Sequence, residues 1–179
     1  MELNFCPQCG QPLLPAATEN PHHRFCRVCR RVHYRNPTVG VAVILLRGKE
    51  ILLIQRKGSY PGQWCIPCGH VEWDEDLRKA ACREFREETG LAITLGPVFD
   101  ARSNFHDLRR QTVGIWFYGR QPRGKLKPGS DALAADFFAL ERLPTPMAFP
   151  TDALICARLL RDFRPAIQDY SPGSSTRKL

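Results

Sequence analysis

The sequence predicts a mixed α/β domain that follows a small segment held together by a metal. Two apolar runs rich in β-branched residues, 38–46 and 51–56, indicate buried strands, and a charged helical pattern precedes Gly90. Two Cys-x-x-Cys pairs lie within the first 35 residues. Because this segment has few aliphatic residues, it needs a covalent or metal constraint to fold.

These patterns divide the 179 residues into three parts: a metal-binding module at 1–35, the main domain at 36–170 and a disordered polar tail at 171–179. The chain begins without a secretory signal, and no apolar run reaches the ~18 residues of a membrane span. We therefore expect a cytoplasmic protein that does not bind membranes. The net charge of +8 favours anionic partners such as phosphates or nucleic acid.

The order of elements in the main domain is strands first, then one acidic helix, then further strands and a last helix. The first two strands flank the turn-like segment RGKE and predict a hairpin. In the acidic helix we expect Asp74 as the N-cap, Glu75 and Asp76 in the first turn, and Gly90 at the C-terminus. The remaining expected elements are strands at 92–102, 111–119 and 136–140 and a helix at 151–163.

The cysteine pairs in FCPQCG and FCRVCR have the spacing of two zinc knuckles that close one tetrahedral site. A redox role would need one solvent-facing pair, whereas two matched pairs in a segment with little core favour a structural metal. We therefore predict that one Zn²⁺ is bound by Cys6, Cys9, Cys26 and Cys29.

Another Cys-x-x-Cys pair, Cys65 and Cys68, lies in WCIPCG. A second metal or redox site is the alternative, but we interpret this pair, with Cys82 and Cys156, as small core side chains. The five histidines are expected in solvated loops, since only His22 and His23 are adjacent.

Two carboxylates of the acidic helix lie on the side that should face the protein. At about 100° per residue, Glu88 falls only about 40° from Glu84, and both share a stripe with Phe85. A charged surface helix explains the spacing of Arg83 and Glu87, but not two carboxylates on the inward stripe. Periodicity alone leaves a buried salt bridge and a divalent metal site open.

The segment GHVEWDEDLRKAACREFREETGL, residues 69–91, resembles the Nudix box in full. Gly69 is followed after five residues by Glu75, and then after seven residues by REFREETGL, in which every specified position matches. The resemblance covers most of residues 36–165. It implies a Nudix α/β/α sandwich with a mixed sheet, which binds Mg²⁺ or Mn²⁺ through its loop-helix-loop.

By that resemblance, Glu84 and Glu88 are the main metal ligands, and Glu87 ligates directly or through water. Arg83 and Glu75 form a supporting ion pair, and the region of Gly69 supplies a backbone carbonyl. At position 68 the family commonly has Gly or Ala, so Cys68 is expected to alter this loop slightly.

The chemistry that the resemblance implies is hydrolysis of a phosphoanhydride bond in a nucleoside diphosphate derivative. Metals neutralise the diphosphate, and an activated water attacks phosphorus without a covalent protein intermediate. Glu84, Glu88 and Asp131 are the candidate general bases. Candidate contacts to phosphate or base are Arg56, Arg102, Phe105, Arg109 and Arg110.

A zinc ribbon followed by a Nudix domain resembles two branches, the NADH pyrophosphatases and the hydrolases of ADP-ribose and FAD. The first has a SQPWPFP-like element after its box, which PVFDARSNFHDLRR lacks. The ending LPTPMAFPTDALICARLLRDF is more similar to the second branch. We therefore expect ADP-ribose or FAD as substrate, with NADH or NAD-capped RNA as the alternative.

A function of another class is a nucleic-acid-binding module on a Nudix scaffold that does not catalyse, based on the basic segment RVCRRVHYR. The intact box argues against it. The resemblance also suggests a homodimer, an assembly that is common among relatives of this kind.

Overall fold

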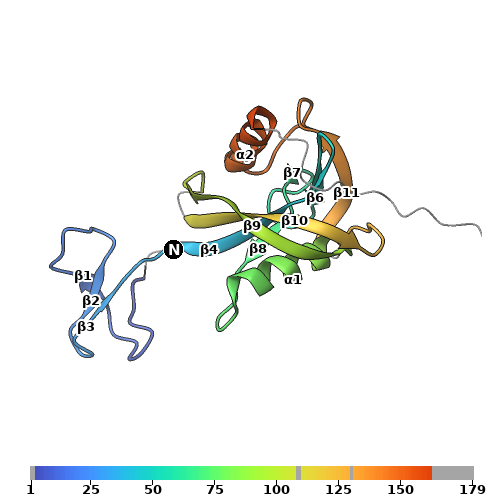
Figure 1. Ribbon diagram of the computed structural model, residues 1–179. Coiled ribbons are helices and arrows are strands. Elements are labelled where there is room, and N and C mark those ends of the chain that lie inside the picture. The colour runs from blue at the N-terminus through green and yellow to red at the C-terminus, as the bar shows by residue number, and fades with distance from the viewer. Residues whose placement is uncertain (1–2, 108–109, 130, 163–179) are drawn as a thin grey trace, which may run out of the picture.

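The computed structural model describes residues 3–107, 110–129 and 131–162. A small N-terminal lobe of short strands lies beside a larger lobe in which sheets pack between two helices (Figure 1). The expected tail, 171–179, and residues 163–170 of the expected main domain lie outside the described residues.

The small lobe is a three-stranded antiparallel sheet. It consists of β1 (Leu14–Pro15), β2 (Arg24–Cys26) and β3 (Arg31–His33), in that order. Each Cys-x-x-Cys pair is followed directly by a residue with positive φ, 73° at Gly10 and 53° at Arg30. The chain therefore turns back sharply after each pair, as the spacing of the cysteines predicts.

The first sheet of the large lobe has the order β8-β4-β10-β9. Its strands are β4 (Thr38–Ile44), β8 (Cys68–His70), β9 (Ala92–Asn104) and β10 (Thr112–Arg123). Strands β4 and β10 are parallel, whereas β4 pairs with β8, and β10 with β9, in antiparallel fashion. The predicted mixed sheet is confirmed, and its edge strand β8 contains Gly69, the first residue of the segment that resembles the Nudix box.

The second sheet has the order β11-β6-β5. It contains β5 (Leu46–Arg47), β6 (Glu50–Arg56) and β11 (Ala132–Ala139), and β7 (Trp64–Cys65) also pairs with β6. The expected hairpin is shorter than its two apolar runs, since only β5 pairs with β6. The chain passes from the first sheet to the second at Leu45, because β4 pairs with β8 and β10, whereas β5 pairs with β6.

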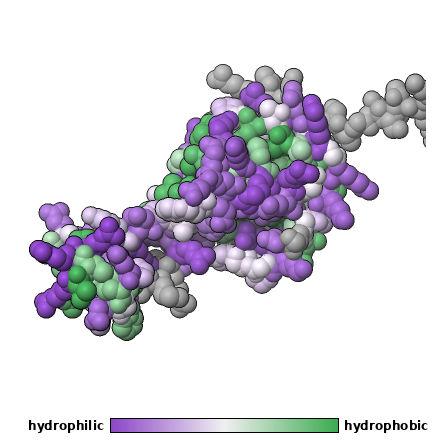
Figure 2. Space-filling model, turned by 90° about the horizontal axis from the view of Figure 1, so that it is seen from below, coloured by the Kyte–Doolittle hydropathy of each residue, from purple (hydrophilic) through white to green (hydrophobic). Residues whose placement is uncertain are grey.

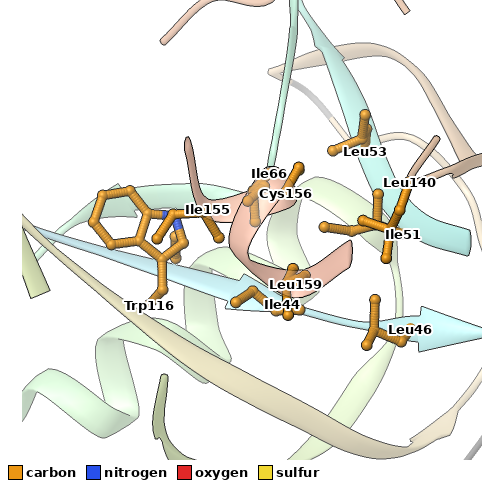
Figure 3. Close-up of a cluster of buried hydrophobic side chains, with 11 residues drawn as sticks. Ile44, Leu46, Ile51, Leu53, Ile66, Trp116, Leu140, Ile155, Cys156 and Leu159 are labelled. Atoms are coloured by element: carbon orange, nitrogen blue, oxygen red, sulfur yellow. The ribbon is translucent and has the colours of Figure 1, made fainter. Parts of the chain in front are cut away.

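The two helices pack on opposite sides of the sheets (Figure 1). Alternate residues of β4 point to opposite sides: Val41 and Val43 pack with the cluster of α1 (Leu77–Thr89), and Ala42 and Ile44 with that of α2 (Pro150–Arg161). Figure 3 shows the second cluster, in which side chains from β4, β6 and α2 meet. This arrangement is the predicted α/β/α sandwich.

The start of α1 corrects one expectation. Asp76, and not Asp74, is the N-cap, and its carboxylate accepts hydrogen bonds from the backbone N–H groups of Arg78 and Lys79 at 3.0 and 3.1 Å. Asp74 has a φ of 62° and cannot begin a right-handed helix. Glu75 consequently lies before the helix, where its side chain is free to turn back toward Arg83. Gly90 ends α1 in the left-handed conformation, as predicted.

The face of the large lobe seen in Figure 2 is mostly hydrophilic. Among the described residues, no helix has the length and apolar content needed to cross a membrane.

Candidate active site

Arg83 joins the loop before α1 to the carboxylates on the helix. Its Nε and one terminal nitrogen donate to the two carboxylate oxygens of Glu75, each at 2.8 Å. The same terminal nitrogen also donates to the backbone carbonyl of His70 at 3.2 Å. Hydrogen bonding from Arg83 lowers the pKa of Glu75 to about 2. One ionised pair thus holds the helix to β8 and the segment that follows it, residues 68–75, which we call the Gly69 loop.

The other terminal nitrogen of Arg83 contacts two further carboxylates, Glu84 at 2.8 Å and Glu87 at 3.3 Å. The side chain of Glu84 is 18% exposed, and that of Glu87 is 57% exposed. Arg83 therefore orients Glu84 inside the site, whereas Glu87 lies at its rim.

Gly69 leaves the space that the carboxylate of Glu84 occupies. A Cβ atom at position 69 would lie 1.9 Å from the carboxyl carbon of Glu84 and 2.3 Å from each of its oxygens. Only glycine permits this approach, because no real Cβ tolerates such contacts. The absence of a side chain at position 69 therefore lets the Glu84 carboxylate approach the backbone of β8, beside the carbonyl that the resemblance assigns to the metal.

Glu88 is a buried carboxylate, with 6% of its surface exposed. The backbone N–H of Cys68 donates to one of its oxygens at 2.8 Å. Burial raises the pKa of Glu88 to about 8, and the charges of Glu84 and Asp131 act in the same direction, while the Cys68 hydrogen bond and Arg56 oppose the shift. A buried carboxylate with two acidic neighbours is stabilised in its charged form by a nearby cation.

The donor set fits a hard divalent ion. Glu84 and Glu88 supply carboxylate oxygens at the Gly69 loop, and Mg²⁺ typically binds one or two carboxylates and completes its shell with water and phosphate oxygens. Glu87 does not join a compact group of ligand atoms. Among the described residues, such a group of three or more Asp, Glu, His or Cys side chains occurs only at the N-terminal cysteines.

A cavity of about 200 Å³ opens beside this loop. Its wall includes Cys68, Gly69 and His70. Glu84 and Glu88 are not among the lining residues, but their carboxylates adjoin Gly69 and Cys68 of this wall. Two of the expected substrate contacts, Arg56 and Arg110, line the cavity.

Two of the other expected substrate contacts, Arg102 and Phe105, do not line the cavity. Arg102 donates to Asp100 at 2.8 Å, in a network that also includes Arg158. Phe105 is 60% exposed and does not line the cavity either. Arg109 lies outside the described residues.

Arg56 is held rigidly at the cavity wall. Its Nε donates to the backbone carbonyl of Ser59 at 2.8 Å, and a terminal nitrogen donates to the Ser59 hydroxyl at 2.9 Å. The other terminal nitrogen contacts the sulfur atoms of Cys65 and Cys68 at 3.7 and 3.8 Å. Such a fixed guanidinium can hold a phosphate group without losing further side-chain freedom.

Several residues of the cavity carry no sequence motif, and the sequence did not predict them. Asp152 is 2% exposed, and its carboxylate accepts hydrogen bonds from the Ile66 backbone at 3.0 Å and from the indole of Trp116 at 3.2 Å. Burial raises the pKa of Asp152 to about 7. The aromatic residues Tyr60, His106 and Phe149 also line the cavity. They come from three separate loops, so no local pattern could group them.

The four N-terminal cysteines form one cluster whose sulfur atoms all lie within 4.8 Å of one another. Cys9 and Cys26 are 3.5 Å apart, and the backbone N–H of Cys29 donates to Cys26 at 3.3 Å. The group fits the tetrahedral sulfur site that the spacing predicts. His33, expected in a solvated loop, is half-buried and lies 3.5 Å from the sulfur of Cys6.

The remaining cysteines have different surroundings. Cys65 and Cys156 are fully buried in the core, as predicted. Cys68 and Cys82 are half-buried, and Cys68 also lines the cavity. The interpretation as small core side chains therefore fits the first two best.

The model of the NUDIX domain family matches residues 36–159. An ADP-ribose pyrophosphatase of Methanocaldococcus jannaschii is 36% identical over 124 residues, which cover 68% of this chain and 73% of that protein. The NAD-capped RNA hydrolase NudC of Vibrio cholerae is 29% identical over 146 residues, 79% of this chain. The chain spans only about half of that relative, 51% of its length.

A crystal structure of a NUDIX hydrolase from Nitrosomonas europaea superposes with a TM-score of 0.76 at 24% identity. The match covers 94% of this chain and 97% of that one, so the likeness in fold includes the N-terminal lobe.

Proposed function

Because the chain belongs to the NUDIX family, we propose that it is a metal-dependent hydrolase that cuts the pyrophosphate bond of ADP-ribose, FAD or both and releases AMP. One observation carries the proposal. The carboxylates of Glu84 and Glu88, a helical turn apart on α1, meet the Gly69 loop at the wall of a cavity that also presents Arg56.

Glu84, Glu88 and the carbonyl near Gly69 would hold Mg²⁺ or Mn²⁺, and Glu87 would contribute from the rim. When bound, these ions neutralise the diphosphate and lower the pKa of coordinated water. The protein's own residues supply the geometry. Arg83 keeps Glu84 in place through its contacts with Glu75, and the positive charge of Arg56 binds the phosphate groups on the cavity side. The candidate general bases are Glu84, Glu88 and Asp131.

The choice of substrate rests on two observations. The chain lacks the SQPWPFP-like element after the box, which disfavours NADH, and one relative bears the name ADP-ribose pyrophosphatase. The alternative is an NAD-capped RNA or NADH, supported by the likeness to NudC of Vibrio cholerae. Arg56, Arg102 and Arg109 are the proposed substrate contacts. Arg56 lines the cavity, Arg102 does not, and Arg109 lies outside the described residues.

We assign the N-terminal lobe, residues 1–35, a structural Zn²⁺ at Cys6, Cys9, Cys26 and Cys29, and residues 36–170 the hydrolase activity. The predicted small-molecule partner is a nucleotide. A homodimer and a cytoplasmic location remain proposals.

The test is product analysis with purified protein, Mg²⁺ and a panel of ADP-ribose, FAD, NADH and NAD-capped RNA. We expect AMP from ADP-ribose or FAD, and loss of nearly all turnover in Glu88→Gln. Glu141→Gln is the matched control, because this exposed glutamate pairs only with Lys49 at 3.2 Å, among the contacts of the described residues, and lies outside the site. Activity confined to NADH or to nucleoside triphosphates would refute the choice of branch.

The same panel, together with RNA binding at several salt concentrations, tests the alternative that the chain is a nucleic-acid-binding module without catalytic activity. A nucleic-acid-binding module would show salt-dependent RNA binding and no hydrolysis of any pyrophosphate. Equal turnover by wild type and Glu88→Gln would exclude Glu88 from the mechanism.

A further inference from the structure

Three residues that line the cavity, Tyr60, His106 and Phe149, bring their aromatic rings next to one another. The ring centroids of Tyr60 and His106 are 5.6 Å apart, those of Tyr60 and Phe149 5.6 Å, and those of His106 and Phe149 5.5 Å. The three residues follow β6, follow β9 and precede α2, respectively. Their meeting is a feature of the tertiary structure alone, and we call it the aromatic end.

The rings are held in position by polar contacts. The Tyr60 hydroxyl and Nε2 of His106 are 3.0 Å apart, and the opposite ring nitrogen of His106 contacts the side chain of Asn104. The guanidinium of Arg56 lies 5.2 Å from the centre of the Phe149 ring. Tyr60 has a φ of 57°, a conformation that is unfavourable for a bulky residue and is typical of functional sites. The loop thus holds the tyrosine ring at the cavity wall against its backbone preference.

The first turn of α2 adds a polar group that lacks a partner. Thr151 is 8% exposed and lines the cavity, and its hydroxyl has no hydrogen-bond partner among the residues that the structure describes. The N-cap residue of α2, Phe149, has no side chain that could cap the helix. The neighbouring Asp152 differs from Thr151, because each of its two carboxylate oxygens accepts a hydrogen bond. An unpaired buried hydroxyl destabilises a fold, and a ligand or an ordered water that pairs with it removes this cost.

The chemistry of the aromatic end matches a planar ring with polar edges. Aromatic faces stack on any heteroaromatic base, and a hydroxyl can both donate to and accept from the edge of such a base. A phosphate suits this end less well, because the buried carboxyl of Asp152 adjoins Thr151. The positive charge of Arg56 lies instead between the aromatic end and the Gly69 loop, where the diphosphate would be held.

We propose that the aromatic end binds the planar heteroaromatic ring of the substrate, with Thr151 as a hydrogen-bonding partner of its edge. This inference rests on the proposed function and deepens it, since it makes the base a determinant of specificity. Adenine and the flavin ring share this chemistry, so either end of FAD, or the adenine of ADP-ribose, would satisfy the site.

The experiment measures equilibrium binding of AMP, FMN and the base-free ribose 5-phosphate to the zinc-loaded protein, for wild type, Thr151→Val, Thr151→Ser and His106→Ala. Valine removes the hydroxyl and keeps the shape, whereas serine keeps the hydroxyl. We expect AMP or FMN to bind at least about tenfold more tightly than ribose 5-phosphate, because stacking and one edge contact each favour the base. Thr151→Val and His106→Ala should each lower the affinity for the base-bearing ligand, relative to ribose 5-phosphate, about fivefold to tenfold. Thr151→Ser should retain the wild-type preference.

Thermal unfolding separates this role from a structural one. Because the Thr151 hydroxyl has no partner among the described residues, Thr151→Val should keep or raise the midpoint of unfolding while it weakens binding of the base. The preference for AMP over FMN, or the reverse, identifies the ring. Equal affinities for base-bearing and base-free ligands, or equal losses for both in Thr151→Val, would overturn the inference even if turnover is found. Binding of AMP without hydrolysis of any pyrophosphate would instead refute the proposed function.

Discussion

Glu88→Gln should stabilise the fold at alkaline pH while it abolishes turnover. The buried carboxyl of Glu88 has a pKa of about 8, well above the ordinary glutamate value, because burial disfavours its charge. Between these two values the unfolded chain has released the proton and the folded chain retains it. The free energy of unfolding of the metal-free site therefore falls as the pH rises through this window, and the loss is complete above pH ~8.

The size of the effect follows from the pKa. Each tenfold change in proton affinity is worth about 1.4 kcal/mol. Raising the pKa of Glu88 from 4.5 to about 8 therefore lowers the free energy of unfolding at alkaline pH by at most about 5 kcal/mol. Glutamine is neutral at every pH and can still accept the hydrogen bond from the Cys68 backbone. We therefore expect the free energy of unfolding of Glu88→Gln to exceed that of the wild type by at least about 2 kcal/mol at pH ~9, and to equal it near pH ~4.

The assay is urea unfolding of the zinc-loaded protein without magnesium or manganese, followed by tryptophan fluorescence at several pH values. The three tryptophans, Trp64, Trp73 and Trp116, all lie after residue 36, so the signal reports on the large lobe alone. Asp152, with a pKa of about 7, contributes the same pH dependence to both proteins and cancels in their difference. Parallel curves for wild type and variant across the whole pH range would refute the argument that ionised Glu88 is unstable without a metal.

Three further changes test other contacts of the site. Gly69→Ala would place a methyl group against the carboxylate of Glu84 and should reduce kcat about a hundredfold. Gly58→Ala is the control, because the Cβ added there meets nothing within 4 Å, and it should keep wild-type turnover. Arg83→Lys keeps the charge but loses the two-pronged contact with its acidic partner, so we expect a loss of tenfold to a hundredfold in kcat/KM, and an unchanged value would contradict the positioning role. Cys26→Ser should abolish zinc binding, measured by metal analysis, while the tryptophan-detected transition of the large lobe stays in place; retention of a full equivalent of zinc would exclude the four-cysteine site.

The sequence alone determined the features that depend on local spacing. Four cysteines in two pairs predicted one compact sulfur site, and the helical periodicity predicted that Glu84 and Glu88 share the inward side of a helix that ends at Gly90. Local periodicity reports such features because neighbours on a helix or a knuckle are near in sequence.

Only the tertiary structure decided where the helix begins and what surrounds the carboxylates. Asp74 and Asp76 are equally suitable caps by residue type, and the backbone conformation at residue 74 settles the choice. The aromatic end depends on loops that are distant in sequence. The extent to which the inward-facing Glu88 is buried, and the lack of a partner for the Thr151 hydroxyl among the described residues, depend on how sheets and helices pack. Burial and long-range proximity are properties of the packed chain, so no pattern of adjacent residues records them.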